Sequence, residues 1–563
     1  MQRLADFLAR YERWIPFALF VIFLLVTLPG VDWGAPDLWN PDELVWRVIK
    51  ALDGEMKFDE TEPDYNYPSL PKHVMYGVMG AARALGASPE AMLVSARLVS
   101  VLLGGLTVLL IYAMTKMAGA HIYVRLLSAF FALSNTALVH NARFAHNDLY
   151  LLFFVTLSLF AIIKYRLSLQ RGWLYLAFFS AGCAASSKYT GASITAILLF
   201  VFLVTVWKDL RRDFLRQAET LFIAATLTAG GFVLGTPKAL LWASFYFKRM
   251  VPAALRFASY GRGPDSLVGL YGQWDTFREA VGAAVYYLFL LAFAWFVLSF
   301  LSQAITASRQ SSIANRKSQI EDRKSEIVNR KSQIAGILLF AIVIFDIPFL
   351  MSYNYVPRFF LPFLPMFAVL AGLFVEDLFA SLIPKLPAQR VIASLVSLAL
   401  LLVIAASFLR VVSVALLFAN DARTPAGKFL ETLEPGTLLE FTLYPPTVPE
   451  NHFSKARNYP IYLVKYPGET VPTNKPYLYN QGEGGLYERQ VDYLVVDSFT
   501  YERFSDAYIC ETNPVECEFF NRLIAGETDL RLLASFEYSL PPFLPQISLA
   551  AVNPDIKIYA IPR

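Results

Sequence analysis

The sequence predicts an all-α polytopic membrane protein with a small α/β domain near its C-terminal end. Of its 563 residues, 56% are hydrophobic and 17% are charged, whereas soluble domains carry about 25% charged residues. Apolar runs long enough to cross a bilayer recur as far as residue 419, and prolines and charges increase after it. We therefore expect a transmembrane domain over residues 1–419 and a separate domain over residues 420–563.

Eleven apolar runs are expected to span the membrane. They are residues 15–30, 91–115, 124–140, 148–164, 173–187, 191–207, 219–236, 281–302, 335–353, 359–376 and 390–418. Arg3, Arg10 and Arg13 precede the first run and no small-residue cleavage site follows it, which predicts an uncleaved span rather than a signal peptide. An odd number of spans puts the two termini on opposite sides.

Lysine and arginine are concentrated in alternate short loops, and this asymmetry sets the expected orientation. Loops rich in these residues stay in the cytoplasm. The rule places the N-terminus in the cytoplasm and residues 420–563 outside it, in a plasma (inner) membrane protein. Arg143, Lys188 and Arg358 lie in short outer loops, against this rule, and are therefore candidates for function.

Charge and cysteine content exclude several classes of protein. The net charge is +4, and the positive residues fall in particular loops, so nucleic acid is not an expected partner. Three cysteines are too few for a disulfide scaffold or a multi-cysteine metal site. Cys183 lies in an apolar run and is expected to be buried. Cys510 and Cys517 can pair if their domain faces an oxidising compartment, and the sequence leaves this open.

The first long outer segment, residues 31–90, opens with Asn40-Pro41-Asp42-Glu43. We interpret Asp42 and Glu43 as the floor of an active site. The alternative is an ordinary helix start, with Asn40 as the cap and the carboxylates in the first turn. Residues 44–52 follow with one apolar face, which suits a helix lying in the membrane interface. An aromatic turn at 64–71 and a second helix over 72–85 complete the segment.

Two further loops have unusual composition. The outer loop 237–280 mixes aromatic and cationic residues, which favours contact with lipid headgroups at the membrane boundary. The loop 304–334 contains a seven-residue repeat with one isoleucine per repeat. One apolar position in seven is too few for a coiled coil, so we interpret this loop as a basic linker.

The C-terminal residues carry a mixed pattern. Residues 424–433 are expected to form a helix, and residues 437–443, 491–497 and 556–561 to form strands. These elements predict a small α/β domain on the extracytoplasmic side.

Polar residues in four separate outer loops lie close to the ends of spans. They are Asp42 and Glu43; Arg143, His146, Asn147 and Asp148; Ser187, Lys188 and Tyr189; and Tyr353, Tyr355 and Arg358. Ionisable groups at membrane depth are costly unless they are paired or face a watery cavity. Each has a simpler alternative: Asp148 can cap a helix, His146 can be packed or solvent-facing, and Lys188 and Arg358 can reach lipid headgroups.

Together, two acidic sites and two cations on one membrane face suit a reaction on a phosphate-bearing lipid. Cations would bind the phosphate, and a carboxylate would accept a proton from the attacking group. The alternative is a transporter or flippase of lipid-linked sugars, although transporters usually carry inverted repeats and interrupted helices near mid-membrane. A third possibility is an interaction or assembly protein whose outer domain does the work.

Several stretches resemble the GT-C superfamily of integral-membrane glycosyltransferases. The closest group is glycosyltransferase family 39, the protein O-mannosyltransferases and their aminoarabinose-transferase-like relatives. The resemblance covers about residues 10–380. The stretches that carry it are Asn40 to Glu43, Tyr65 to Leu70, Arg143 to Asp148, Ser187 to Thr190, and Tyr355 to Pro362, where Phe359 stands at the family's usual tyrosine.

The resemblance implies an inverting glycosyltransferase. A sugar would move from a polyprenyl-phosphate donor to an acceptor protein, lipid or glycan on the extracytoplasmic side. Asp42 would be the general base, Glu43 would position it, and Asp148 would be a second acidic residue of the site. Lys188 and Arg358 would hold the donor phosphate. The residues that would bind substrate are Tyr67, Arg143, His146, Asn147, Tyr189 and Tyr355.

No spacing of histidine, aspartate and glutamate demands a metal, because cations alone can balance the leaving phosphate. We therefore expect no required cofactor. A divalent cation at Asp42 and Asp148 remains an open alternative.

Overall fold

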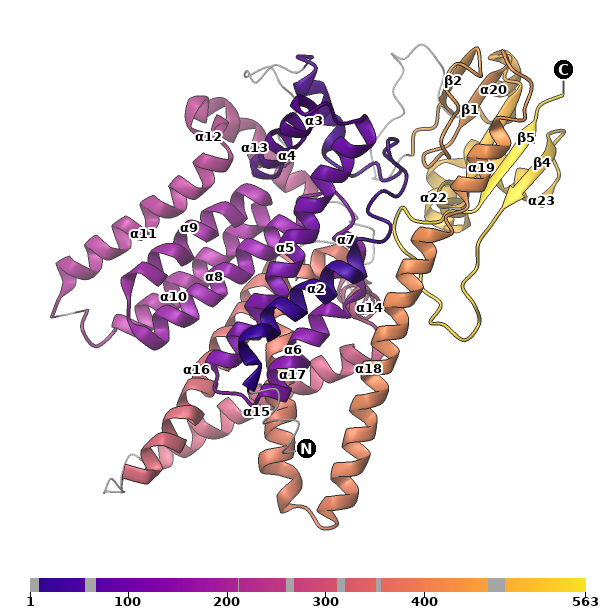
Figure 1. The fold of residues 1–563 in the computed structure, drawn as a ribbon. Coiled ribbons are helices and arrows are strands. Elements are labelled where there is room, and N and C mark those ends of the chain that lie inside the picture. Colours follow the sequence, from indigo (N-terminus) through magenta and orange to yellow (C-terminus); the bar gives the residue numbers. More distant parts are fainter. Residues whose placement is uncertain are drawn as a thin grey trace. The chain divides into compact units, whose positions relative to one another are not determined.

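The computed structural model describes residues 10–55, 67–210, 212–259, 268–310, 319–350, 356–463 and 481–562 (Figure 1). The described residues form two compact units. The helical unit comprises described residues within 10–31, 44–259 and 268–411. The sheet unit comprises Asp32–Glu43 and residues 412–562. The boundary therefore lies within a helix, and the stretch that includes Asn40 to Glu43 groups with the sheet unit.

The helical unit consists of helices throughout its described residues. They are η1 (Glu12–Trp14), α2 (Ile15–Thr27), α3 (Val45–Leu52), α4 (Leu70–Ala84), α5 (Pro89–Met117), α6 (Ile122–Leu133), α7 (Thr136–Asn141), α8 (Asp148–Ser168), α9 (Arg171–Ser187), η2 (Tyr189–Ser193), α10 (Ile194–Val206), α11 (Phe214–Gly235), α12 (Lys238–Leu241), α13 (Ala243–Ser259), α14 (Val268–Val281), α15 (Ala283–Gln310), α16 (Gln319–Leu350), η3 (Pro357–Phe363), α17 (Leu364–Asp377), η4 (Leu378–Leu382), η5 (Ile383–Lys385) and α18 (Gln389–Ala419).

Seven helical stretches among the described residues are long and apolar enough to cross a membrane. They are Pro89–Met117, Asp148–Ser168, Tyr189–Val206, Phe214–Gly235, Ala283–Gln303, Pro357–Lys385 and Gln389–Leu430. The other four predicted spans fall on α2, on α6 with α7, on α9 and on α16. The predicted class, a helical polytopic membrane protein with a small α/β domain, is confirmed. The number of eleven spans stays a prediction.

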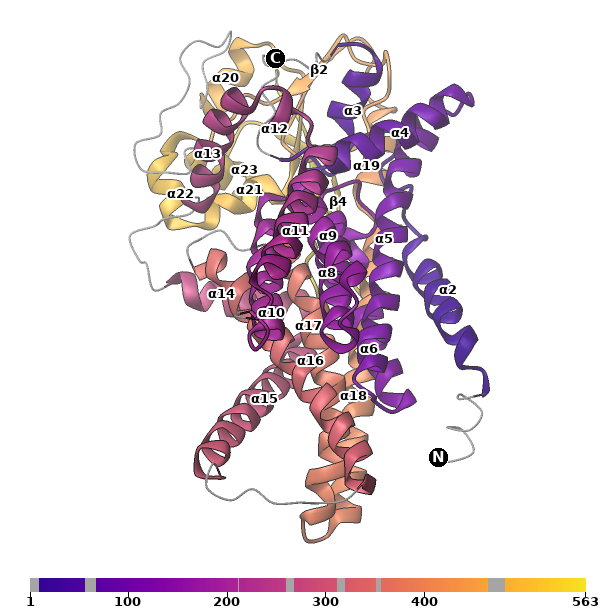
Figure 2. The ribbon, with the colours of Figure 1, turned by 90° about the vertical axis from the view of Figure 1, so that its left-hand side faces the viewer.

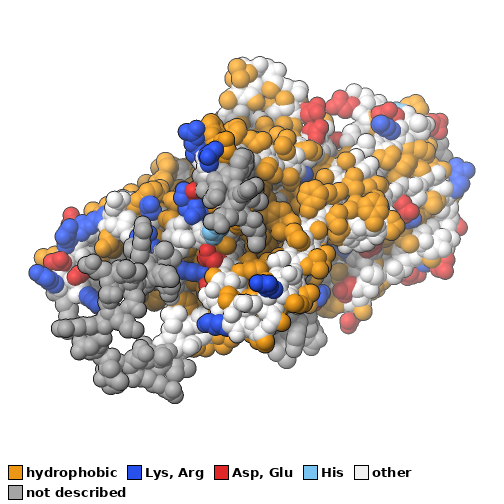
Figure 3. Space-filling model, turned by 60° about the horizontal axis from the view of Figure 1, so that its bottom comes forward, with side chains coloured by type: hydrophobic (Ala, Val, Ile, Leu, Met, Phe, Trp, Pro, Cys, Tyr) orange, Lys and Arg blue, Asp and Glu red, His pale blue; other side chains and the backbone are white. Residues whose placement is uncertain are grey.

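Hydrophobic side chains remain exposed on the membrane helices. On α18, Leu395, Leu398 and Leu401 are more than half exposed. Figure 3 shows such side chains gathered in broad areas on one face of the molecule. In a soluble protein exposed apolar areas of this kind would mark an interface, but on a spanning helix they face lipid.

Helix α9 packs between α8 and α11 (Figures 1 and 2). Small residues permit this close approach: a β-carbon on Gly182 would lie 2.1 Å from the carbonyl oxygen of Thr228, and one on Gly231 would lie 2.4 Å from that of Phe179. Small residues at helix contacts are typical of membrane bundles. The packing fixes the end of α9, where the residues that we expected to bind phosphate begin.

The helices predicted over 44–52 and 72–85 are present as α3 and α4. The alternative interpretation of Asn40 to Glu43 as a helix start is wrong, because α3 begins at Val45. Instead, the Asn40 side-chain oxygen accepts a hydrogen bond from the Asp42 backbone N–H at 3.1 Å, and the Glu43 N–H donates to the Asn40 carbonyl at 3.2 Å. Asparagine commonly stabilises a turn in this way.

The sheet unit contains a five-stranded sheet in the order β2-β1-β3-β5-β4. Its strands are β1 (Leu438–Phe441), β2 (Lys455–Asn458), β3 (Tyr493–Asp497), β4 (Arg531–Phe536) and β5 (Ile556–Ala560). Its helices are α19 (Arg423–Leu430), α20 (Gly482–Glu488), α21 (Ser498–Tyr501), η6 (Glu502–Ser505), α22 (Ala507–Thr512) and α23 (Pro514–Ala525). The predicted α/β domain is present. Its three predicted strands correspond to β1, β3 and β5.

Cys510 and Cys517 form a disulfide that joins α22 to α23. Cys183 is a free, buried cysteine, as its apolar surroundings predict.

Beside the disulfide, Glu516 is a buried carboxylate in the core of the sheet unit. It is 0% exposed, and its Oε2 is hydrogen-bonded to the Tyr459 hydroxyl at 3.1 Å. Burial raises the pKa of Glu516 from 4.5 to about 7, while the hydrogen bonds from Tyr459 and from the Gly482 backbone oppose the rise. The folded state therefore favours the protonated form of Glu516.

We predict that the sheet unit loses stability as the pH rises from 4.5 to about 7. A carboxyl whose folded-state pKa is raised stabilises the fold below its unfolded pKa, and this contribution disappears as the pH passes the folded pKa. The size of the effect is about 3 kcal/mol, from about 1.4 kcal/mol for each pKa unit. Hydrogen exchange of β3 amides in the whole protein, measured across this pH range, would report it.

Glu516→Gln should remove this component of the pH dependence, because glutamine keeps the shape and does not ionise. Glu511→Gln, at an exposed position of α22, serves as the matched control and should leave the pH dependence unchanged. An identical pH profile in wild type and Glu516→Gln would contradict the assignment.

Candidate active site

Asp148 is the centre of a charged cluster in the helical unit. It is the first residue of α8 and is 1% exposed. The Lys188 Nζ donates to its Oδ1 at 2.8 Å, and the His146 Nδ1 lies 2.7 Å from its Oδ2. The Arg358 Nε lies 3.5 Å from the same Oδ2. Residues separated by more than 200 positions in the chain therefore meet at one buried carboxylate.

The side chain of Asp148 does not cap α8. Asn147 occupies the capping position, and no side chain caps the helix there. Both Asp148 oxygens instead face neighbouring cationic or histidine side chains, which is how a buried charge becomes tolerable. The simpler alternative for Asp148, a helix cap, is therefore wrong.

Lys188 and Arg358 share the aromatic ring of Phe359 as well as the Asp148 carboxylate. The Lys188 Nζ lies 4.2 Å from the ring centre, and the Arg358 guanidinium carbon lies 5.9 Å from it. A cation over a ring face is attracted by the negative charge of that face. Phe359 stands where the family usually has tyrosine, and its ring offers this face without the tyrosine hydroxyl. Both cations therefore keep their contact with a ring at this position.

Local structure explains the place of Lys188. Helix α9 ends at Ser187, and Lys188 adopts an extended conformation before η2 begins. The chain then turns tightly, because a β-carbon on Gly191 would lie 2.4 Å from the Ala184 carbonyl oxygen and 2.8 Å from Leu151. Glycine at 191 thus lets η2 pack against α9 and α8, which keeps Lys188 beside Asp148.

His146 and Asn147 are buried beside Asp148 and retain hydrogen-bonding capacity. His146 is 2% exposed, and its ring contacts that of Tyr67 edge-on at 5.9 Å between centres. The Asn147 amide donates to the Ser187 carbonyl at 3.2 Å. Among the described residues, the His146 Nε2 and the Asn147 Oδ1 have no hydrogen-bond partner. Buried polar atoms in this state normally bind a ligand or water.

Arg143 has a different environment from the other predicted site residues. It is 0% exposed, and it donates to three backbone carbonyls: Val139 at 2.6 Å, Val26 at 2.8 Å and Pro29 at 2.9 Å. The carbonyls at the end of a helix lack partners within the helix. Arg143 therefore supports the C-terminal end of α2, and a role in substrate binding stays a prediction.

The remaining predicted substrate-binding residues lie as follows. The Tyr189 hydroxyl is hydrogen-bonded to that of Tyr246 on α13 at 2.7 Å. Tyr67 accepts a hydrogen bond from Lys72 through its carbonyl at 3.3 Å and contacts His146 through its ring. Tyr355 lies outside the described residues.

Asp42 and Glu43 belong to the sheet unit. Their stretch is held by Arg423, whose guanidinium contacts the rings of both Trp33 and Trp39, at 4.8 and 4.4 Å from their centres. Arg423 also donates to the Trp39 carbonyl at 3.2 Å. Asp42 is exposed, whereas Glu43 is 1% exposed. The residue after Glu43, Leu44, donates its N–H to the Ala145 carbonyl within the helical unit at 3.1 Å.

Tyr444 is a neighbour of Asp42 that the sequence did not reveal. Burial raises the pKa of Tyr444, and the negative charge of Asp42 raises it further, while Arg503 opposes the rise. Tyr444 lies in a strand-end loop with no distinctive motif, so composition and spacing gave no signal for it.

No cluster of three or more histidine, cysteine, aspartate or glutamate side chains suited to a metal ion occurs within the described ranges. The alternative of a divalent cation at Asp42 and Asp148 stays a prediction.

Comparisons with known proteins bear on the family. Residues 82–251, which contain Asp148 and Lys188, match the model of the dolichyl-phosphate-mannose-protein mannosyltransferase family. No curated protein matches the chain.

The chain is also similar to solved structures of two proteins. The S. cerevisiae protein O-mannosyltransferase Pmt1-Pmt2 complex bound to the sugar donor shares 21% identity over 43% of this chain and 34% of that one, with a TM-score of 0.34. The chain thus matches about a third of the yeast protein's length. ArnT from Cupriavidus metallidurans bound to undecaprenyl phosphate shares 13% identity over 99% and 100% of the two chains, with a TM-score of 0.45. The apo state of the same ArnT shares 14% identity over 98% of this chain and 100% of that one, with a TM-score of 0.46.

The family match covers the stretches Arg143 to Asp148 and Ser187 to Thr190, two of those on which the resemblance to glycosyltransferase family 39 was based. The resemblance is confirmed over residues 82–251, where this integral membrane protein is similar to the dolichyl-phosphate-mannose-protein mannosyltransferase family.

Proposed function

We propose that the protein is an inverting glycosyltransferase that moves a sugar from a polyprenyl-phosphate donor to a hydroxyl of a protein, lipid or glycan. The observation that carries the proposal is the buried cluster of Lys188, Arg358 and His146 around Asp148. The two cations, Lys188 and Arg358, outnumber the single carboxylate of Asp148. Such a site suits an anionic phosphate. The unpartnered atoms of His146 and Asn147 support a polar ligand at the same place.

Asp42 is the general base in this proposal. It accepts the proton of the acceptor hydroxyl while the oxygen attacks the anomeric carbon from the face opposite the phosphate. The bond between that carbon and the phosphate oxygen breaks, and its electron pair leaves with the polyprenyl phosphate. Lys188 and Arg358 stabilise the charge on this leaving group, and Glu43 positions Asp42. The exposed carboxylate of Asp42, its motif, and the Leu44–Ala145 hydrogen bond support this role.

Asp148 positions the cations instead of acting as a base. Its Oδ1 accepts from Lys188, and its Oδ2 is close to both His146 and Arg358, so neither oxygen is available to a hydroxyl proton. The proposed reaction takes place on the extracytoplasmic side. The Cys510–Cys517 disulfide supports an oxidising compartment for the sheet unit.

We predict that Asp42→Asn lowers sugar transfer by at least about 100-fold, because general base catalysis contributes roughly 10²–10⁴. The measurement is transfer from a polyprenyl-phosphate sugar to acceptor by the reconstituted protein. Asp37→Asn, an exposed aspartate of the same stretch, is the matched control and should retain full activity. Full activity of Asp42→Asn would remove Asp42 as the base. Translocation of the lipid-linked sugar without transfer would favour a flippase.

We predict that Lys188→Ala and Arg358→Ala each weaken binding of polyprenyl phosphate by at least about tenfold, since a hydrogen bond between charged groups contributes about 1.5–3 kcal/mol. Binding of the uncharged polyprenol should not change. Lys164→Ala, at the other end of α8, is the control. Equal weakening for both lipids would mean that the substitutions disturb the fold rather than a phosphate site.

A further inference from the structure

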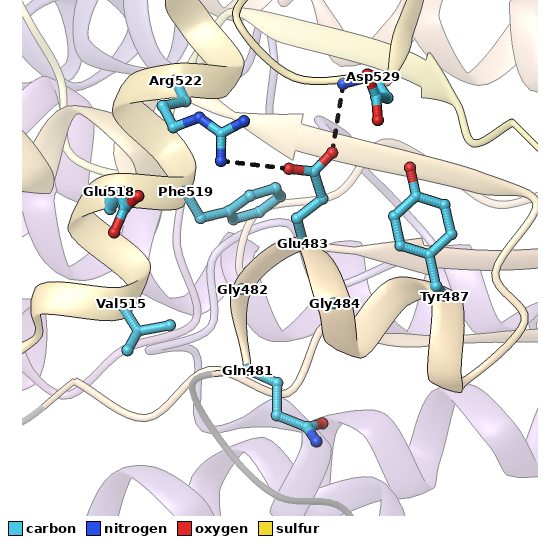
Figure 4. Close-up of a pocket in the computed structure, with 10 residues that line it drawn as sticks. All are labelled: Gln481, Gly482, Glu483, Gly484, Tyr487, Val515, Glu518, Phe519, Arg522 and Asp529. Atoms are coloured by element: carbon cyan, nitrogen blue, oxygen red, sulfur yellow. Dashed lines mark hydrogen bonds and ion pairs between the residues drawn. The ribbon is translucent and has the colours of Figure 1, made fainter.

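The sheet unit contains a cavity of its own, with a volume of about 430 Å³. It lies between α20, α23 and the residues before β4 (Figure 4). The polar and aromatic side chains that line it include Gln481, Glu483, Tyr487, Glu518, Arg522 and Asp529. Its volume falls in the range of about 300–1,000 Å³ typical of small-ligand sites.

Hydrogen-bond donors and acceptors alternate around this cavity. Figure 4 shows the Glu483 carboxylate between Arg522 and Asp529. The Arg522 guanidinium lies 3.6 Å from the Glu483 Oε2, and the Asp529 backbone N–H donates to the Oε1 at 3.3 Å. At the edge, the Gln481 amide donates to Glu488 at 2.8 Å and accepts from Arg489 at 3.3 Å. Hydroxyl groups both donate and accept, so a polyhydroxylated ligand can satisfy such a lining.

Aromatic rings supply the apolar part of the wall. Tyr487 is 41% exposed and comes from the same helix, α20, as Glu483. Phe519 is 3% exposed and stacks on Tyr459 at 5.9 Å between ring centres. An exposed ring face offers a flat, weakly negative surface on which the C–H bonds of a sugar ring can pack.

The base of the cavity is rigidly held. Gly482 lines it, and the carbonyl of Gly482 accepts a hydrogen bond from the buried Tyr459 hydroxyl at 3.1 Å. The same hydroxyl is bonded to Glu516, which is 0% exposed. These buried bonds fix the start of α20, so the cavity is formed before any ligand arrives and binding requires little ordering.

Charge selects among ligands. Three carboxylates and one guanidinium line the cavity, which gives a net charge of −2 and disfavours a phosphate or another anion. A wholly apolar ligand would leave the polar groups buried without partners. We propose that this cavity binds a carbohydrate that carries no negative charge. The site is distinct from the Asp148 cluster, and the proposal does not depend on the transferase activity.

The test uses the whole protein in phosphatidylcholine nanodiscs, because detergents with sugar headgroups would compete. Saturation-transfer NMR would measure binding of maltose and glucosamine, with glucose 6-phosphate as the anionic counterpart. Maltose and glucosamine should bind, and glucose 6-phosphate should bind at least about tenfold more weakly. Polyprenyl phosphate should not displace the bound sugar, which separates this site from the proposed active site.

Variants of the lining identify the place of binding. Tyr487→Ala and Glu483→Gln should each weaken maltose binding by at least about tenfold, and glutamine at 483 keeps the shape of the side chain. Tyr538→Ala, in the same unit and outside the cavity, should bind as wild type does. Any one of three results would overturn the proposal. The wild type could fail to bind maltose and glucosamine, the Tyr487 and Tyr538 variants could bind maltose equally, or the protein could prefer glucose 6-phosphate.

Discussion

The arrangement of the helical unit depends on one buried carboxylate. Asp148 begins a membrane helix and is 1% exposed, so its charge is tolerable only with close cationic partners. Lys188 comes from the turn after α9, and Arg358 from η3. These elements are far apart in the chain. They must lie beside Asp148 in the folded protein, because the buried carboxylate needs both cations close to it. Removing one partner of such a buried pair costs roughly 3–5 kcal/mol.

The same constraint prepares the site for chemistry. In the proposed function, two cations that share Asp148 and the ring of Phe359 are already oriented before a lipid phosphate arrives. Donors fixed in advance stabilise developing charge better than donors that must reorganise. The Asp148 carboxylate balances one of the two positive charges, whereas a bare pair of cations at membrane depth would repel each other. A carboxylate that is unsuited to act as a base is therefore well suited to hold the cations in place.

Features that depend on a local sequence pattern could be predicted from the sequence. Apolar runs predicted the helices, and cations that break the orientation rule identified Lys188 and Arg358 as unusual before their contact with Asp148 was known. Contacts between residues far apart in the chain could not be predicted from the sequence. Arg423 contacts the rings of Trp33 and Trp39, almost 400 positions earlier, and no local pattern reveals that Asp32–Glu43 joins the sheet unit. Likewise β2 and β4 were not predicted, because their residues are mostly exposed and carry little apolar alternation.

Arg143 and Glu516 show why burial alone does not define an active site. Both are fully buried ionisable residues, yet Arg143 donates to three backbone carbonyls and supports a helix end. Glu516 is paired with Tyr459 and fixes the residues beneath a cavity. The Asp148 cluster combines a buried ion pair with two unpartnered polar atoms: within the described chain, the His146 Nε2 and Asn147 Oδ1 are buried and have no hydrogen-bond partner. Buried polar atoms are nearly always hydrogen-bonded, and in the proposed function the bound substrate completes the hydrogen bonds of these two atoms.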